Sequence, residues 1–199
     1  MESSGFTFSG KIIHDSLDYQ QQQQLRLIFP LLPNKKTLKI KIQLLKMKIL
    51  IRPTKFTDIP GMIKVNVESL PENYDKLFWD QQFHIGKEHS FVAVFGSEVV
   101  GYVFCNQDSI ISFAVQEKYR KKGLGRVLLQ HCVSTFSTPV NLSVRVNNTN
   151  AIKLYESFGF KIEKTIPNYY YNPVEDGHSM IRLPMNTLFQ LVKKINVLL

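Results

Sequence analysis

The sequence predicts a mixed α/β fold of the α+β class, built on one sheet with helices packed against it. Three observations lead to this prediction. The 199-residue chain contains 44% hydrophobic residues, enough to bury a core without metal or disulfide staples. Short apolar or alternating runs, typical of strands, recur between segments with helical spacing. Their order is strand, two helices, three strands, helix, strand, helix and two strands, which fits neither a doubly wound sheet nor a helical bundle.

The first half of this pattern runs from a strand to a hairpin. Residues 47–53 form the first strand, and Thr57 or Asp58 offers the N-cap of a helix that Pro71 ends. Residues 75–83 form a second, short helix rich in aromatic side chains. Three strands are then predicted, the first two as a hairpin, at 91–95, 99–105 and 110–115.

The second half alternates helices and strands. Residues 124–136 place their apolar side chains on one face of a helix. Four further elements follow, a strand, a short helix and two strands, at 140–146, 150–158, 160–166 and 179–183. Residues 186–199 carry apolar side chains at helical spacing, which indicates an amphipathic C-terminal tail that docks a partner or covers the sheet.

The net charge of +9 is concentrated near the start of the chain. Residues 1–46 form a predicted N-terminal extension, basic and partly of low complexity, with a glutamine run at 20–24. Alternation at 38–42 predicts a half-buried strand, with a basic membrane-surface helix as the alternative. The basic excess fits either a solvated tail or contact with a polyanion such as RNA or the ribosome. Met47 is a candidate natural start, in which case the residues upstream are dispensable.

Composition excludes several classes of protein. No run approaches 18 apolar residues, so no membrane-spanning helix is expected. Cys105 and Cys132 are the only cysteines, which excludes a disulfide framework and a four-cysteine zinc site and fits the cytoplasm. The five histidines are scattered without cysteine partners at ligand spacing, so no metal site is predicted.

One basic turn of the sequence, at residues 120–126, is a candidate ligand-binding site. Gly123 and Gly125 remove side chains where a backbone must approach a ligand, and the helix that follows points its first N–H groups at the same place. This arrangement predicts a pyrophosphate cradle, with a solvated tight turn as the alternative. The turn is neither a Walker loop nor a dinucleotide fingerprint, because the required lysine and third glycine are missing. The cations beside the glycines are Arg120, Lys121, Lys122 and Arg126.

These residues resemble the GNAT family of acetyl-CoA-dependent N-acetyltransferases. Arg120-x-x-Gly123-x-Gly125 matches the family's acetyl-CoA loop, and Asn148, Ala151, Leu154-Tyr155 and Phe158-Gly159-Phe160 match its later motif. The resemblance covers residues 47–185 and implies a single GNAT-like domain with a mixed, mostly antiparallel, twisted sheet flanked by helices. It implies that acetyl-CoA, the acetyl donor, is bound by Phe113, Ala114, Val115, Arg120, Lys121, Lys122, Gly123, Leu124, Gly125, Arg126, Asn148 and Tyr155.

A narrower resemblance is to the catalytic subunits of NatA-type N-terminal acetyltransferases and to bacterial ribosomal-protein N-acetyltransferases. Residues 70–74, Leu-Pro-Glu-Asn-Tyr, match their loop between the first two helices, and residues 167–170 match their last hairpin. The resemblance implies a protein or peptide N-terminus as the acceptor, and an auxiliary subunit or the ribosome as a partner, without nucleic-acid recognition or membrane binding. The implied acceptor groove consists of Leu70, Pro71, Glu72, Tyr74, Arg145, Tyr169 and Tyr170.

The implied reaction is direct attack of an amine on a thioester in a ternary complex. Glu72 is the candidate base, and Tyr155 is the candidate hydrogen-bond donor to the departing thiolate. Relatives often carry Glu or His where this chain has Ser143, so either Glu72 or a held water must accept the proton. A small-molecule amine or lysine acetyltransferase is the alternative function, and a non-catalytic acyl-CoA-binding protein is a further one.

Overall fold

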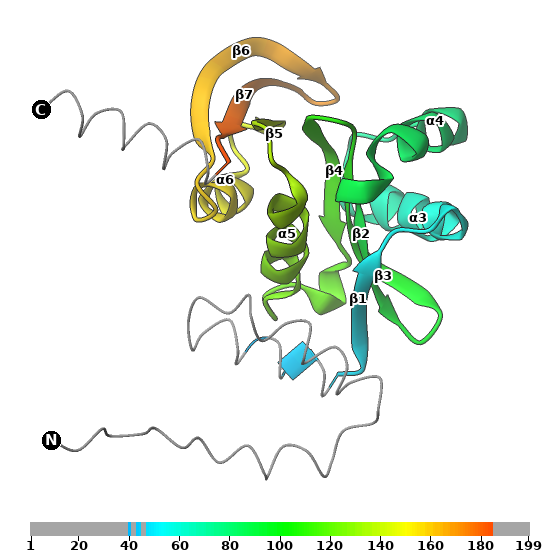
Figure 1. The fold of residues 1–199 in the computed structure, drawn as a ribbon. Helices are drawn as coiled ribbons and strands as arrows, with labels where there is room; N and C mark the ends of the chain where they lie inside the picture. The colour runs from blue at the N-terminus through cyan, green and yellow to red at the C-terminus, as the bar shows by residue number, and fades with distance from the viewer. Residues whose placement is uncertain (1–39, 41–42, 45–46, 185–199) are drawn as a thin grey trace, which may run out of the picture.

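The computed structural model describes residues 40, 43–44 and 47–184, and these contain one seven-stranded sheet (Figure 1). Its strand order is β1-β2-β3-β4-β5-β7-β6. All neighbouring strands are antiparallel except β4 and β5, which are parallel, so the predicted mixed and mostly antiparallel sheet is confirmed. The strands are β1 (Ile49–Pro53), β2 (Phe91–Phe95), β3 (Glu98–Cys105), β4 (Ser109–Val115), β5 (Val140–Arg145), β6 (Lys161–Tyr171) and β7 (Val174–Arg182).

Helices cover both faces of the sheet (Figure 1). They are α3 (Ile59–Ser69), α4 (Lys76–Gly86), α5 (Leu124–Thr135) and α6 (Thr149–Glu156), with short 3-10 turns η3 (Phe56–Asp58), η4 (Lys87–His89) and η5 (Glu117–Tyr119). The apolar residues of α3 and α4 form one buried cluster, and those of α5 belong to another. No helix in the described ranges combines the length and the apolar character needed to span a bilayer.

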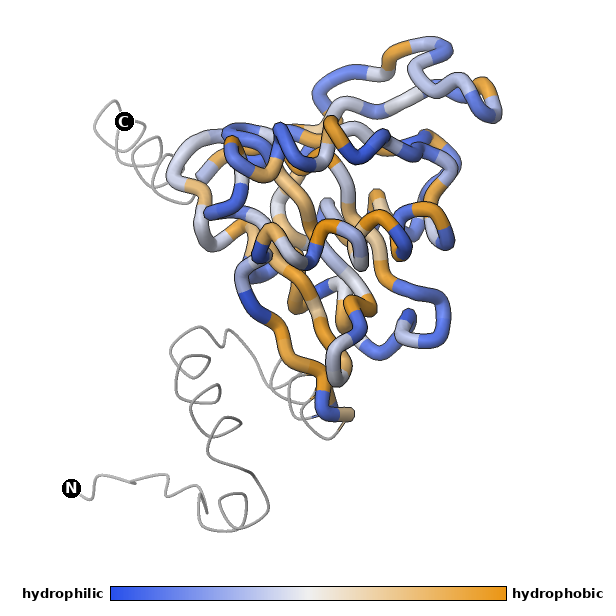
Figure 2. The backbone as a smooth tube through the Cα atoms, turned by 90° about the vertical axis from the view of Figure 1, so that its right-hand side faces the viewer, coloured by the Kyte–Doolittle hydropathy of each residue, from blue (hydrophilic) through white to orange (hydrophobic). Residues whose placement is uncertain are grey.

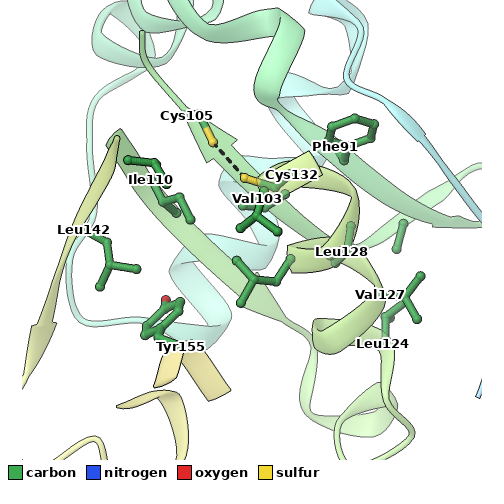
Figure 3. Packing of buried hydrophobic residues seen from close by; sticks show 14 of the residues in the cluster. Phe91, Val103, Cys105, Ile110, Leu124, Val127, Leu128, Cys132, Leu142 and Tyr155 are labelled. Carbon is green, nitrogen blue, oxygen red and sulfur yellow. Dashed lines mark hydrogen bonds between the residues drawn. The ribbon is translucent and has the colours of Figure 1, made fainter. Parts of the chain in front are cut away.

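Strand β3 lies between the two clusters and is buried almost throughout because helices pack on both of its faces. Figure 3 shows Val127 and Leu128 of α5 in the same packed layer as Val103 of β3. In that layer the thiols of Cys105 and Cys132 are free, buried and 3.5 Å apart. Along the chain, the hydrophobic segments run through the interior of the domain and the outer turns are mostly hydrophilic (Figure 2).

On the other face, a buried polar network fixes α3 to the sheet. Asn66 donates from Nδ2 to Tyr102 Oη at 3.0 Å and to Ser112 Oγ at 3.3 Å, and these two hydroxyls lie 2.7 Å apart. The three side chains come from α3, β3 and β4, so the network joins three elements. Because buried polar groups are costly unless paired, this satisfied network favours one packing of α3 on the sheet.

Three details differ from the sequence predictions. Asp58 does occupy the N-cap position of α3, but its side chain does not cap that helix; it pairs with Arg52 at 2.6 Å and accepts a hydrogen bond from Lys55 N. Strands β6 and β7 are longer than predicted, because their pairing continues to Tyr171 and Val174 after an irregular stretch. The alternating pattern of 38–42 predicts a strand, yet Ile40 is helical.

The chain upstream of Met47 contributes to the domain. Leu44 is 3% exposed and belongs to the cluster under α5, and Ile40 packs against that cluster. The remainder of the predicted extension, including the glutamine run, and the predicted tail at 186–199 lie outside the described residues. The domain boundaries at 47 and 185 therefore stay predictions.

Candidate functional site

A cavity of about 870 Å³ opens where β4 and β5 separate. These strands pair only at Ser109–Asn141 and Ile110–Leu142, so beyond those pairs their facing edges line the cavity. Two further walls complete it. The glycine-turn wall consists of Arg120, Lys121 and residues 123–126, and the hairpin wall consists of Leu70, Pro71, Glu72, Tyr74, Arg145, Tyr169 and Tyr170.

The cavity brings together every predicted site residue except Lys122. The Lys122 ammonium donates to the Lys118 carbonyl oxygen at 2.6 Å and lies over the Tyr119 ring, so this side chain points elsewhere. The residues that line the cavity are Leu70, Pro71, Glu72, Tyr74, Phe113, Ala114, Val115, Arg120, Lys121, Gly123, Leu124, Gly125, Arg126, Arg145, Asn148, Tyr155, Tyr169 and Tyr170.

The glycine-turn wall is shaped by two residues with positive φ. Lys121 has a φ of 58° and Gly123 a φ of 84°, and Gly123 is the N-cap of α5. The first hydrogen bond of the helix runs from Val127 N to Gly123 O. The N–H groups of residues 124–126 therefore precede the helical ladder. Together with the positive end of the helix dipole, they make this wall suited to an anion such as phosphate.

Two arginines of this wall are held in place by neutral partners. Arg120 donates from Nε to the Val115 carbonyl oxygen at 2.8 Å. Arg126 donates to Ser157 Oγ at 3.0 Å and lies 5.2 Å from the centroid of the Phe158 ring. Since neither bond neutralises the guanidinium, both positive charges remain available to an anionic ligand.

The hairpin wall is organised by ion pairs around one guanidinium. Arg145, only 13% exposed, donates from Nε and a terminal nitrogen to Glu72 Oε1, at 2.9 and 2.6 Å. It also donates to Glu175 Oε2 at 3.0 Å and to the carbonyl oxygens of Asn172 and Pro173. Arg145 thus ties the loop after α3 to the β6–β7 hairpin. Among the described residues, none hydrogen-bonds the second oxygen of Glu72, Oε2.

Aromatic rings enclose this ion pair. The Arg145 guanidinium lies 4.4 Å from the centroid of the Tyr170 ring, and the rings of Tyr169 and Tyr170 meet edge to face at 4.9 Å. Burial raises the pKa of Tyr170, as does the nearby negative charge of Glu72. Burial also raises the pKa of Tyr74, with smaller contributions from Tyr169 and Glu72. Both phenols therefore stay protonated at neutral pH, and both residues line the cavity.

Tyr155 comes from α6 and lines the cavity. Its ring packs against Phe113 and Phe160, with centroids 6.2 and 5.7 Å away, and its hydroxyl points toward the strands near Leu142 (Figure 3). Burial raises the pKa of Tyr155, so its hydroxyl remains a hydrogen-bond donor at neutral pH. Asn148 caps α6, because its Oδ1 accepts from Ala151 N at 3.2 Å, and this cap fixes the helix that carries Tyr155.

Comparison with known proteins identifies the fold and the chemistry. The model of the acetyltransferase (GNAT) family matches residues 59–160. This chain belongs to the GNAT family. It is 35% identical over 151 residues to an N-alpha-acetyltransferase of Sulfurisphaera tokodaii, a match that covers 65% of this chain and 90% of that relative.

Solved structures show the same similarity. Ard1 from Thermoplasma volcanium aligns with a TM-score of 0.62 and 27% identity, over 69% of this GNAT chain and 98% of that one. Arabidopsis thaliana Naa50, solved in complex with the bisubstrate analogue CoA-Ac-MVNAL, aligns with a TM-score of 0.61 and 25% identity, over 67% and 97% of the two chains. The protein is therefore an acetyl-CoA-dependent N-acetyltransferase.

The cavity of this GNAT domain fits acetyl-CoA. A Cβ added at Gly125 would lie 3.3 Å from Phe113 Cζ and 3.8 Å from Leu154 Cδ2, so a longer side chain would fill the slot between α5 and β4. The glycine-turn wall offers N–H groups and cations to the phosphates. Among the described residues, no cluster of three or more His, Cys, Asp or Glu side chains is placed to hold a metal ion.

The sequence matched Glu175 to the last hairpin of the N-terminal acetyltransferases but did not predict a role for it in the site. Glu175 holds Arg145 from the hairpin and accepts a hydrogen bond from Asn147 N at 2.9 Å. Its cross-strand pairing with Tyr170 was the available signal, but that register depends on a hairpin longer than the sequence predicted. Ser143 does line the cavity, and the residue opposite it on β7 is Ser179, so neither position supplies a base.

Proposed function

We propose that this acetyltransferase acts on the N-terminal α-amine of a protein or peptide, and that the hairpin wall receives this amine. One observation carries the proposal. Arg145 connects the loop after α3 to the β6–β7 hairpin, and Glu72 and Tyr170 both contact its guanidinium group. A carboxylate and the faces of aromatic rings both attract an ammonium group. Relatives named N-alpha-acetyltransferases support the choice of acceptor.

The donor site in this proposal is the glycine-turn wall with the splayed edge of β4. When bound, acetyl-CoA supplies an acetyl group activated as a thioester. The N–H groups at the start of α5 and the guanidinium groups of Arg120 and Arg126 would bind its phosphates, and Phe113 and Val115 would line the path of the rest of the molecule. In this proposal the cationic glycine-turn wall faces the phosphates of acetyl-CoA, and the Glu72 carboxylate faces the ammonium group of the acceptor.

Glu72 accepts the proton that the acceptor ammonium must lose before it can attack. Its Oε1 is committed to Arg145, whereas Oε2 has no partner among the described residues and is free to take the proton, directly or through a water. The ion pair with Arg145 fixes the carboxylate in one position. The serine at position 143 makes this role of Glu72 more necessary, because a hydroxyl is no base at neutral pH.

Two further groups stabilise charge that develops during the reaction. A backbone N–H of β4 near Val115 stabilises the oxyanion of the tetrahedral intermediate, since this part of the strand has no partner strand on the β5 side. The Tyr155 hydroxyl, protonated at neutral pH, donates a hydrogen bond to the departing thiolate. The transfer is direct, and the buried thiols of Cys105 and Cys132 take no part in it.

A matched pair of peptides tests the acceptor. The two peptides share one sequence without lysine, and the second has its N-terminus blocked by a formyl group. The proposal predicts acetylation of the free peptide and none of the blocked one, measured as release of free CoA thiol. Equal rates would contradict it, and turnover with a polyamine but neither peptide would favour the small-molecule alternative. Thioester cleavage in the absence of any acceptor is expected to be negligible.

We also propose an auxiliary subunit or the ribosome as a partner, and the cytoplasm as the compartment. Exposed apolar side chains on α3 and α4, including Val67 and Leu77, support a protein partner. The unlinked Cys105 and Cys132 thiols support a reducing compartment. Co-sedimentation of the full-length chain with ribosomes tests the ribosomal alternative, and its absence at low salt would leave the auxiliary subunit as the proposal.

A further inference from the structure

The segment just before β1 packs against the domain at the foot of α5. Ile40, Gln43 and Leu44 are helical, and Met47 N donates to the Gln43 carbonyl oxygen at 3.1 Å. Leu44 is buried in the same cluster as Leu124, the first residue of α5. In Figure 1 this segment lies below α5, beside the start of β1. The chain upstream of Met47 therefore reaches the part of the domain that begins the glycine-turn wall.

Ile40 contacts the glycine turn itself. A Cβ on Gly123 would lie 2.9 Å from Ile40 Cδ1 and 3.0 Å from Cγ1, and closer still to Cγ2. The Ile40 side chain thus occupies the space into which any other residue at position 123 would project. Because Gly123 has a φ of 84° and is the N-cap of α5, its position determines where the first N–H groups of that helix point.

Ile40 approaches the turn from outside the cavity. Gly123, Lys121 and Leu124 line the cavity, and Ile40 is absent from its lining residues. A side chain that only filled the ligand site would be expected among those residues. The contact is therefore a support behind the turn.

We infer that Ile40 is a positioning residue for acetyl-CoA, which acts by holding Gly123 and, through it, the N–H groups of α5. This inference rests on the assignment of the glycine-turn wall to acetyl-CoA made under the proposed function. It also means that the residues before Met47 are needed for tight binding of the donor, contrary to the hypothesis that they are dispensable.

The test is the affinity of the full-length chain for coenzyme A, measured by titration calorimetry together with the thermal unfolding midpoint. Ile40→Ala removes the contact with Gly123, and Leu44→Ala is the matched control, since it removes a buried side chain of the same segment. We expect Ile40→Ala to weaken coenzyme A binding about tenfold, within the range that a small displacement of a positioned group produces. Leu44→Ala should lower the unfolding midpoint and change the affinity less than twofold, and Ile40→Val should bind almost as well as the unchanged chain.

Two results would overturn the inference. Ile40→Ala with an affinity within twofold of the unchanged chain would show that the contact does not position the turn. Tighter binding by Ile40→Ala would show that the segment obstructs the site. Failure of the proposed function would look different from failure of this inference. In that case the protein without substitutions would either not bind coenzyme A, or bind it without acetylating an N-terminus.

Discussion

Replacing Glu72 by glutamine removes the proposed proton acceptor while leaving its surroundings in place. The amide oxygen of glutamine can still accept the two hydrogen bonds that Arg145 donates to Oε1. The amide nitrogen then takes the position of Oε2, and it neither accepts a proton nor attracts an ammonium group. The variant therefore separates the chemical role of the carboxylate from its structural role.

The expected loss of kcat follows from the contribution of a positioned general base. Such a base accelerates proton transfer about 10²- to 10⁴-fold, equal to about 3–5 kcal/mol of activation free energy. The free energy of unfolding should change by less than about 1 kcal/mol, because Glu72 is 29% exposed and its geometry is retained. The affinity for coenzyme A should not change, since Glu72 belongs to the hairpin wall.

The assay measures kcat with a free N-terminal peptide, alongside coenzyme A affinity and thermal stability. Glu175→Gln is the matched control, because Glu175 pairs with the same guanidinium but does not line the cavity. It should lower kcat less than tenfold. A kcat for Glu72→Gln within threefold of the unchanged enzyme would remove Glu72 from the mechanism and leave a water held by other groups as the proton acceptor.

Three other substitutions test separate parts of the structure. Tyr155→Phe should lower kcat about tenfold without loss of thermal stability, because the hydroxyl has no hydrogen-bond partner among the described residues; an unchanged kcat would refute its role at the thiolate. Burial opposes the charge of Asp58, but hydrogen bonds from Arg52 and Lys55 N outweigh it and lower its pKa. Asp58→Asn should thus destabilise the fold by about 2 kcal/mol at pH 7, and in denaturant titrations this difference should shrink as the pH falls below about 4. Gly86→Ala should lower the unfolding midpoint sharply, since the added Cβ would collide with the Cys105 carbonyl.

The order of the elements was predictable because the chain keeps two clear periodicities. Strands β2 and β3 appear as apolar runs, since both sheet faces are covered, and α5 shows one apolar face. The glycine turn was also visible, because it depends on local sequence. The structure explains why position 123 is a glycine. Its φ is positive, and the Ile40 side chain occupies the space that a Cβ would need.

What the sequence could not show depends on tertiary contacts. Asp58 looked like a helix cap, but Arg52, six residues away, competes successfully for its carboxylate. Ile40 lies in an alternating pattern typical of a strand, yet it is helical and packs on the domain. Glu175 contacts Arg145 only because the β6–β7 hairpin extends far enough to bring the two residues together. For Ile40 and Glu175 the deciding contact joins residues far apart in the sequence, whereas for Asp58 it joins a helix-cap candidate to the end of the preceding strand. Periodicity within one element encodes none of these contacts.

The acceptor is tested most directly by locating the acetyl group on a product that offers both kinds of amine. A peptide with a free N-terminus and one internal lysine is incubated with acetyl-CoA and the full-length enzyme, and the product is sequenced by tandem mass spectrometry. We predict that the mass increase of roughly 42 Da, which replacement of one hydrogen by an acetyl group produces, is found on the α-amine alone. Acetyl groups found mainly on the lysine side chain would contradict it.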